Sequence, residues 1–252
     1  MESLPRAQPA LRLLTYNIQS GIASPALRSY ITGSWQYFLP SKKRSTNLDN
    51  IARLLRHYDI VALQEVDAGS LRTRFVNQVE YLARQAKFAH WHFQLNRILG
   101  RFAQHSNGIL SRLSIHEIEY HSLPGRITGR GAMVVKLKYH NHFLVIINVH
   151  LALGKNSRQK QLDYLAEIVK QYSTVIILGD MNCTPHHPVI QHTFTDLGLR
   201  CATQDIKTYP SWHPWRALDQ IWVTANLKVR KPQTKHYLYS DHLPISVDVH
   251  FT

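Results

Sequence analysis

The chain has 252 residues, and 44% of them are hydrophobic, which is enough to fill the core of one large domain. Thirty Lys and Arg residues against sixteen Asp and Glu residues give a formal net charge of +14. This excess favours polyanionic partners: nucleic acid, anionic lipid or acidic metabolites. Two cysteines are too few for a disulfide framework, and no apolar run approaches the roughly 18 residues of a transmembrane segment. The composition therefore excludes a disulfide-rich secreted scaffold and an integral membrane protein.

The N-terminal stretch lacks the pattern of a cleavable signal, so we expect a cytoplasmic protein. We expect a single domain over residues 11–252 after a short N-terminal extension over residues 1–10, and a monomer. No change in composition marks a second domain.

Runs rich in β-branched and aromatic residues predict nine strands. In chain order they are residues 11–18, 60–66, 90–95, 108–112, 131–139, 143–151, 174–179, 218–224 and 245–251. Apolar residues recur at helical spacing over residues 47–57, after a cap at Thr46 or Asn47, and over residues 157–172. Both segments indicate amphipathic helices that cover a sheet.

Residues 21–45 form the longest segment without clear periodicity. Trp35, Tyr37 and Phe38 in this segment fit a folded loop over a site as well as they fit simple surface packing. Elsewhere some strands are followed by helices and others by connections of hairpin length. This mixture favours an α/β fold with two packed mixed sheets and helices on the outer faces, rather than a doubly wound parallel sheet.

Several predicted strands end on a polar residue, and a sheet brings the ends of its strands to one edge. Asn17 and Glu65 each follow a β-like run. A carboxylate at the end of the apolar run 60–63 is costly unless it is paired or binds a metal, and Mg²⁺ prefers oxygen donors. For Asn17 the alternative is a turn residue that precedes Gly21.

Asp180 and Asn182 lie two residues apart after the apolar run 175–178. Alternation along an extended segment predicts that both side chains point to the same face and act on one phosphate. The alternative is an Asx-type turn that leads into Pro185.

Eight segments of the chain resemble the endonuclease/exonuclease/phosphatase superfamily, which has the DNase I-like fold, and they occur in the order found in that family. The segments are TYNIQSG, DIVALQEVD, SNGILSR, GRGAMVVKL, INVHLALG, ILGDMNCTP, ALDQIWV and SDHLPISV. The resemblance spans almost the whole chain. It implies a four-layer α/β sandwich that hydrolyses phosphate esters with a divalent cation, Mg²⁺, or Mn²⁺ as its substitute.

The resemblance also implies a metal site and part of the catalytic site. Glu65 matches the metal-binding glutamate of the family, Asn17 matches the asparagine beside it, and Asp241 matches the residue that completes the surroundings of the metal and the histidine. Asp180 matches an aspartate that positions or activates water or assists the leaving oxygen. Asn182 matches an asparagine that contacts the phosphoryl group.

Further roles follow from the same resemblance. Asp219 matches the carboxylate that orients His242, which serves as a general base or stabilises the phosphorane charge. His150 matches a histidine that approaches a phosphate oxygen. Arg130 is a candidate substrate anchor, although an exposed loop arginine is common. Asn107 fits a turn better than a ligand contact.

The branch of the family is less well defined by the sequence. Abasic-site endonucleases usually continue the glutamate motif with a lysine, whereas this chain continues Glu65 with Val66 and Asp67. Small bacterial members with a TYPS...RALDQIWV-like segment are the closest match. We expect a Mg²⁺-dependent phosphodiesterase that acts on DNA or RNA. The alternatives are a phospholipid or small phosphoester hydrolase and a binding module that has lost catalysis. In the lipid case Trp35, Phe38, Trp212 and Trp215 would contact an apolar part of the substrate.

Overall fold

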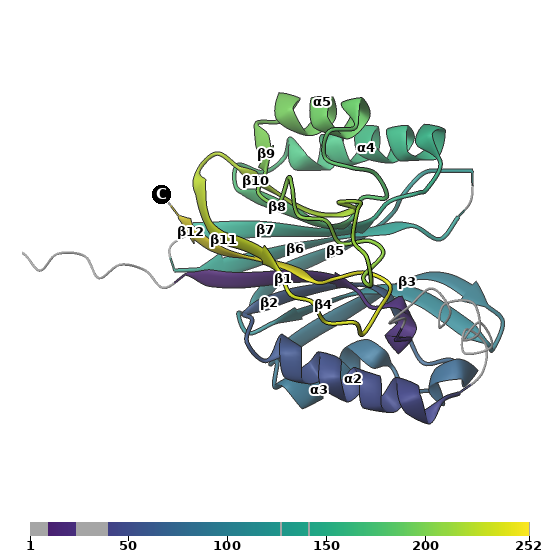
Figure 1. Cartoon of the computed structure of the whole chain (residues 1–252). Coiled ribbons are helices and arrows are strands. Elements are labelled where there is room, and N and C mark those ends of the chain that lie inside the picture. Colours follow the sequence, from purple (N-terminus) through teal and green to yellow (C-terminus); the bar gives the residue numbers. More distant parts are fainter. Residues whose placement is uncertain (1–9, 24–39, 127, 141, 252) are drawn as a thin grey trace, which may run out of the picture.

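The computed structural model describes residues 10–23, 40–126, 128–140 and 142–251 (Figure 1). The three aromatic residues expected in a loop over the site, Trp35, Tyr37 and Phe38, lie outside these ranges.

Twelve strands in the described residues form two six-stranded sheets. The first sheet, in spatial order, consists of β11 (Leu227–Thr234), β12 (Ile245–Phe251), β1 (Leu11–Asn17), β2 (Ile60–Asp67), β4 (Ala103–Ser111) and β3 (His90–Leu99). The second consists of β5 (Ile115–Ser122), β6 (Gly131–Tyr139), β7 (His142–His150), β8 (Val175–Asp180), β10 (Asp219–Thr224) and β9 (Leu199–Cys201). Each sheet is mixed, because β1 and β2 pair in parallel in one and β7 and β8 pair in parallel in the other.

Helices cover the two outer faces of the sandwich (Figure 1). Helices α2 (Lys42–Leu55) and α3 (Gln78–Ala86) pack on the first sheet, and α4 (Lys155–Val169) and α5 (Pro188–Asp196) pack on the second. Short 3-10 turns, η1 (Gln19–Gly21) and η3 (Leu71–Thr73), follow β1 and β2. No helix in the described part of the chain is long and apolar enough to span a membrane.

Three apolar layers hold the four structural layers together. The central layer fills the space between the sheets and includes Leu13, Ile109, Met133, Ile146 and Ile221. A second layer lies between the first sheet and its helices, and a third lies between the second sheet and its helices. The predicted four-layer α/β sandwich is confirmed.

Strands β5, β9 and β11 were not predicted, and neither were helices α3 and α5. Strands β5 and β11 lie at sheet edges, where charged and polar side chains such as Glu117, Arg230 and Lys231 face water and interrupt an apolar pattern. Strand β9 has only three residues, and α3 and α5 have nine each. Segments this short give little periodicity to recognise.

The start of α2 corrects a prediction. The helix begins at Lys42, and the N-cap is Ser41, whose Oγ accepts a hydrogen bond of 3.2 Å from the backbone nitrogen of Lys43. Asn47 lies inside the helix and donates instead to the carbonyl oxygens of Gly21 and Tyr239. Its polar side chain therefore ties α2 to η1 and to the loop that contains Tyr239.

Candidate active site

Polar side chains from both sheets converge at one end of the sandwich. Strands β1 and β2 run parallel and end near Asn17 and Glu65, and β7 and β8 run parallel and end at His150 and Asp180. The side-chain nitrogen of Asn17 lies 3.3 Å from Glu65 Oε1 and 3.2 Å from Asp180 Oδ2. One amide therefore joins carboxylates that belong to different sheets.

Glu65 reaches the cleft because the strand that carries it is bulged. The pairing of β2 with β4 shifts register between Leu63 and Val66, and Glu65 has φ +53°. Gln64 and Val66 are fully buried, whereas the Glu65 side chain is 33% exposed. A bulge re-aims one side chain at the cost of a ladder hydrogen bond. It turns Glu65 out of the apolar pattern of its strand and toward the site.

Two histidines flank the buried carboxylate of Asp180. His150 Nε2 lies 3.4 Å from Asp180 Oδ2 and 3.9 Å from Glu65 Oε1, and His242 Nε2 lies 3.8 Å from the same Asp180 oxygen. Burial, followed by the charge of Arg130, lowers the pKa of His150 well below its usual range. His150 is therefore neutral at pH 7.

His242 has the opposite charge state because it contacts a second aspartate. Its Nδ1 donates to Asp219 Oδ2 at 2.8 Å, and Thr208 Oγ1 donates to the same oxygen at 2.5 Å. Burial lowers the pKa of His242, but the charges of Asp219 and Asp180 outweigh that effect and raise it well above the usual value. The imidazole is protonated at pH 7 and its Nε2 faces Asp180.

Asp241 is held by two polar side chains. Its Oδ2 accepts a hydrogen bond of 3.0 Å from Gln19 Nε2, and its Oδ1 lies 3.2 Å from Ser240 Oγ. Burial raises the pKa of Asp241 to about 6, and Glu65 and Asp180 add to the shift. The pKa of Asp180 is also raised to about 6, by burial first. Burial is the main cause of both shifts, and the carboxylates crowded at this end of the sandwich add to them.

This crowding fits a divalent cation. Carboxylate and amide oxygens are the donors that Mg²⁺ and Mn²⁺ prefer, and a cation would compensate the buried negative charge. Ligand atoms of Asp180, Asp219 and His242 also lie within 4.8 Å of one another. However, Asp219 and His242 hydrogen-bond to each other, so we favour the oxygen-only group around Glu65 and Asp241 as the metal site.

Asn17 does not present its oxygen to this group. Its Oδ1 accepts a hydrogen bond of 3.2 Å from the backbone nitrogen of Gln19, and its nitrogen faces the carboxylates of Glu65 and Asp180. Coordination of a metal by Asn17 would require the amide to rotate, and that role stays a prediction.

The arrangement of Asp180 and Asn182 differs from the predicted extended segment. Asn182 has φ +52°, and its backbone nitrogen donates to Asp180 Oδ1 at 2.9 Å, which is the Asx-type turn. The Asn182 side chain donates to the carbonyl oxygen of Leu151 at 2.8 Å. The prediction from strand alternation is wrong, yet the turn still keeps both residues at the site.

A cavity of about 470 Å³ opens beside this cluster and includes Glu65, His150 and Arg130 in its lining. Asn107 also lines it, but lies in β4 rather than in a turn and donates to the carbonyl oxygen of Gly131 at 3.1 Å. The predicted anchor Arg130 thus shares one cavity with the predicted metal ligand Glu65.

The family model for the Endonuclease/Exonuclease/phosphatase family matches residues 14–242. The chain belongs to this family. Its members are hydrolases that act on phosphate esters and generally use divalent metals. No curated protein matches the sequence.

Solved structures with the same fold have low sequence identity to this chain. An endonuclease/exonuclease/phosphatase from Beutenbergia cavernae is 19% identical, with a TM-score of 0.77 over 97% of this chain and 72% of that chain. The catalytic domain of human Nocturnin with bound sulfate is 20% identical, with a TM-score of 0.71 over 97% and 96% of the two chains. The mannosyl-6-phosphatase Bt3783 from Bacteroides thetaiotaomicron is 14% identical, with a TM-score of 0.70 over 96% and 100%. These similarities establish the fold.

Three polar residues of the site were missed by the sequence analysis. Gln19, Thr208 and Ser240 hold Asp241 or Asp219 in place and are themselves buried. Gln19 and Ser240 lie within the segments TYNIQSG and SDHLPISV, so their positions in the sequence offered a hint. Thr208 opens the TYPS part of the TYPS...RALDQIWV-like segment, but its hydrogen bond to Asp219 is evident only in the structure.

Proposed function

We propose that the protein is a Mg²⁺-dependent phosphodiesterase, with Mn²⁺ as a substitute, and that it cleaves DNA or RNA by in-line attack of water. The observation that carries the proposal is the convergence of Glu65, Asp180, His150 and the Asp219–His242 pair beside a cavity lined with arginine. Carboxylates for a metal, a charged imidazole and cationic anchors are together what phosphoryl transfer requires.

Each residue would have a distinct part in the reaction. Asp180, buried between two imidazoles, would accept the proton of the attacking water. Protonated His242, oriented by Asp219, would donate a hydrogen bond to a phosphoryl oxygen, and this favours stabilisation of charge over general base catalysis. Neutral His150 would offer a further hydrogen bond to the phosphate.

The remaining roles concern the phosphate and the cation. One N–H of the Asn182 amide is used by Leu151, which leaves the other for a phosphoryl oxygen. Arg130, which lines the same cavity, would bind the phosphate through its guanidinium group. Glu65 and Asp241, with Asn17, would hold the cation. When bound, the cation would polarise the phosphate and neutralise charge on the leaving oxygen.

The choice of nucleic acid is supported by charge. The formal net charge of +14 attracts polyanions, and the cavity beside the site contains three arginines but one acid among its described lining residues. We further propose that the protein acts as a monomer in the cytoplasm. Both cysteines are free thiols, which agrees with a reducing compartment.

A phospholipid substrate is the second candidate, and one surface favours it. Phe75, Ile98 and Phe102 are 65%, 59% and 54% exposed. Phe75 follows η3, Ile98 lies near the end of β3, and Phe102 lies in the turn between β3 and β4. The segments are connected, because Ser70 Oγ donates to the carbonyl oxygen of Phe102 and the Ser70 carbonyl accepts from the nitrogen of Phe75. Exposed apolar side chains on such connected segments could enter a lipid surface. The predicted lipid contact Trp215 is also exposed.

A substrate panel tests the proposed function. The wild-type protein is assayed with DNA, RNA, phospholipid vesicles and small phosphoesters in Mg²⁺, Mn²⁺ and EDTA. We expect nucleic-acid cleavage that requires metal and is lost in E65Q and H242A. Lipid turnover without nucleic-acid cleavage would favour the second candidate. Hydrolysis unchanged in both variants would contradict the catalytic assignment, and binding of nucleic acid without hydrolysis by the wild type would indicate a binding module.

A further inference from the structure

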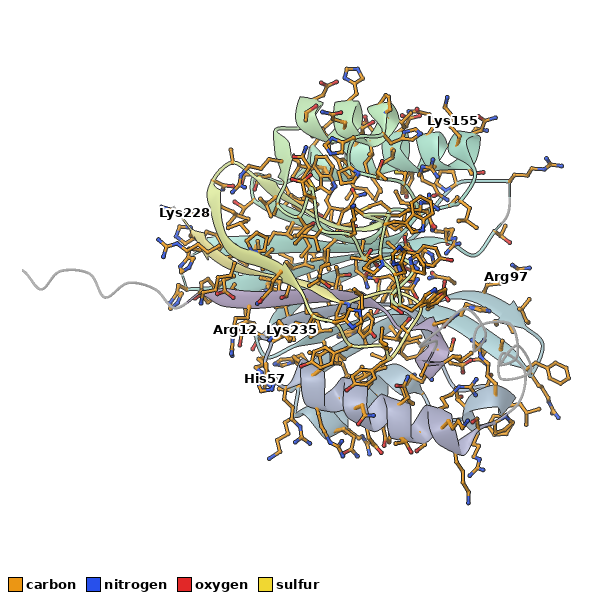
Figure 2. The ribbon with its side chains drawn as sticks, in the orientation of Figure 1. Arg12, His57, Arg97, Lys155, Lys228 and Lys235 are labelled. Atoms are coloured by element: carbon orange, nitrogen blue, oxygen red, sulfur yellow. The ribbon has the colours of Figure 1, made fainter. Side chains whose placement is uncertain are left out.

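The cavity beside the cluster of carboxylates has a cationic wall that the proposed chemistry does not use. Its lining includes Arg97 from β3 and Arg126 from the connection between β5 and β6, in addition to Arg130. Glu65 is the only acidic side chain among the described lining residues. Arg97 lies at the end of the sandwich that carries η1, away from Lys228 at the other end (Figures 1 and 2).

These cations have no carboxylate partner within the described ranges of the chain. Arg72 and Arg84 form ion pairs with Asp67 and Glu80, but neither Arg97 nor Arg126 forms one. Like charges gathered in one cavity repel each other and contribute nothing to folding. An anionic ligand is the group that would stabilise them together.

Contacts between separate elements place the two arginines. Gly129 has φ +102°, and a Cβ at this position would lie 2.8 Å from Arg97 Cβ and 3.1 Å from Arg97 Cδ. The absence of a side chain there is what lets the stem of Arg97 lie against the backbone of Gly129. The backbone nitrogen of Arg126 donates to Ser157 Oγ at 3.2 Å, which ties its segment to the first turn of α4.

The arginines also differ in their distance from the reaction. Arg130 directly precedes β6, the neighbour of the strand that ends at His150, whereas Arg97 lies on the edge strand β3, which β4 separates from β2 and Glu65. Arg130 therefore serves the phosphate that reacts, and Arg97 lies beyond it. The cavity is large enough for more than one phosphate group, because ligand pockets of about 300–1,000 Å³ hold whole small molecules.

We propose that Arg97 and Arg126 form a subsite for a second phosphate group, next to the phosphate that is hydrolysed, and that this subsite selects nucleic-acid strands over substrates with one phosphate. The inference rests on the proposed phosphodiesterase function. Guanidinium groups bind phosphate oxygens in pairs of hydrogen bonds, and a strand offers a phosphate at every nucleotide. The exposed Leu153 in the same lining offers an apolar surface to a sugar or base.

The test compares R97Q/R126Q with R53Q/R84Q, a control that removes two exposed arginines from α2 and α3. For each protein, kcat/KM is measured with a single-stranded oligonucleotide and with bis(p-nitrophenyl) phosphate, a diester with one phosphate. In R97Q/R126Q we expect the ratio of the two kcat/KM values to fall at least about tenfold, the effect of losing a hydrogen bond to a charged group. The control keeps the wild-type ratio. An unchanged ratio in R97Q/R126Q overturns the proposal.

Binding without turnover separates this inference from the proposed function. Fluorescence anisotropy in EDTA measures the affinity of a labelled phosphorothioate oligonucleotide for each protein at several salt concentrations. We expect the slope of log affinity against log salt to fall by about 1.4 in R97Q/R126Q, about 0.7 for each lost phosphate contact. If the wild type cleaves no nucleic acid, the proposed nuclease function fails and this slope alone decides the subsite. A slope equal to that of the control, or no binding by the wild type, overturns it.

Discussion

Replacement of Asp219 by asparagine tests the role of the buried carboxylate that faces His242. Asp219 is fully buried, and its Oδ2 accepts hydrogen bonds from His242 Nδ1 and Thr208 Oγ1. Asparagine keeps the size and a carbonyl acceptor but removes the charge. A hydrogen bond to a charged group contributes about 1.5–3 kcal/mol, so loss of the charge should lower kcat by about 10- to 150-fold.

The same change should alter the protonation of His242. Among the groups that raise the pKa of His242, Asp219 has the largest effect, and burial opposes it. Without the carboxylate the pKa of His242 falls, because burial is then opposed only by the charges of Asp180 and Asp241. Steady-state hydrolysis of a small phosphodiester measures kcat, and NMR titration of the His242 imidazole measures the pKa.

The matched control is D163N, which removes an exposed carboxylate from α4 that accepts a hydrogen bond from Gln159. We expect D163N to keep the wild-type kcat and the wild-type titration of His242. If D219N gave the same kcat and the same titration as D163N, the assignment of Asp219 as the group that charges and orients His242 would be refuted.

Three further predictions concern the metal site and the scaffold. E65Q should weaken Mn²⁺ binding, measured by calorimetry, by at least about tenfold. Substitution of residues that only support metal ligands already lowers metal affinity by this much. D67N should lower the free energy of unfolding by about 3–5 kcal/mol at pH 7, since it removes the carboxylate that forms a buried ion pair with Arg72. Burial raises the pKa of Asp67, but Arg72 and local hydrogen bonds lower it overall, so its stabilising effect is present above about pH 4 and lost as pH falls through the lower native value. Urea unfolding from pH 3 to 7 should therefore show a flatter acid dependence in D67N, and an equally steep one would contradict this. G179A should lower the free energy of unfolding, measured in urea, by at least about 1–3 kcal/mol. Gly179 has φ +142°, and a Cβ there would lie 1.9 Å from the carbonyl oxygen of Val149. A free energy of unfolding equal to that of the wild type would show that the backbone can move aside.

The strands and helices that carry the sandwich were predictable because their apolar patterns are strong. Strands β6 and β12 match the predicted ranges of residues, and the segments for β1, β2, β7, β8 and β10 differ from the predictions only at their ends. Central strands are buried on both faces and so read as apolar runs. Edge strands and short helices lack that pattern.

The site residues were predictable for a different reason. Glu65 and Asp219 stand in apolar runs where a charge is costly, and the motifs around Asp180 and His242 marked the others. Their convergence could only be expected, because it depends on two parallel strand pairs in different sheets that end at one edge.

What the sequence by itself determined was the layered α/β architecture, the family and the residue types of the site, since each follows from local pattern and motif. Tertiary structure alone decided how those residues meet. The bulge that turns Glu65 into the cleft, the hydrogen bond from the Asn182 side chain to Leu151 and the hydrogen bond from Gln19 to Asp241 all depend on contacts between distant segments. The cationic wall of the cavity also depends on tertiary structure. Arg97 and Arg126 lie 29 positions apart in the chain (126 minus 97) and line one cavity only after folding.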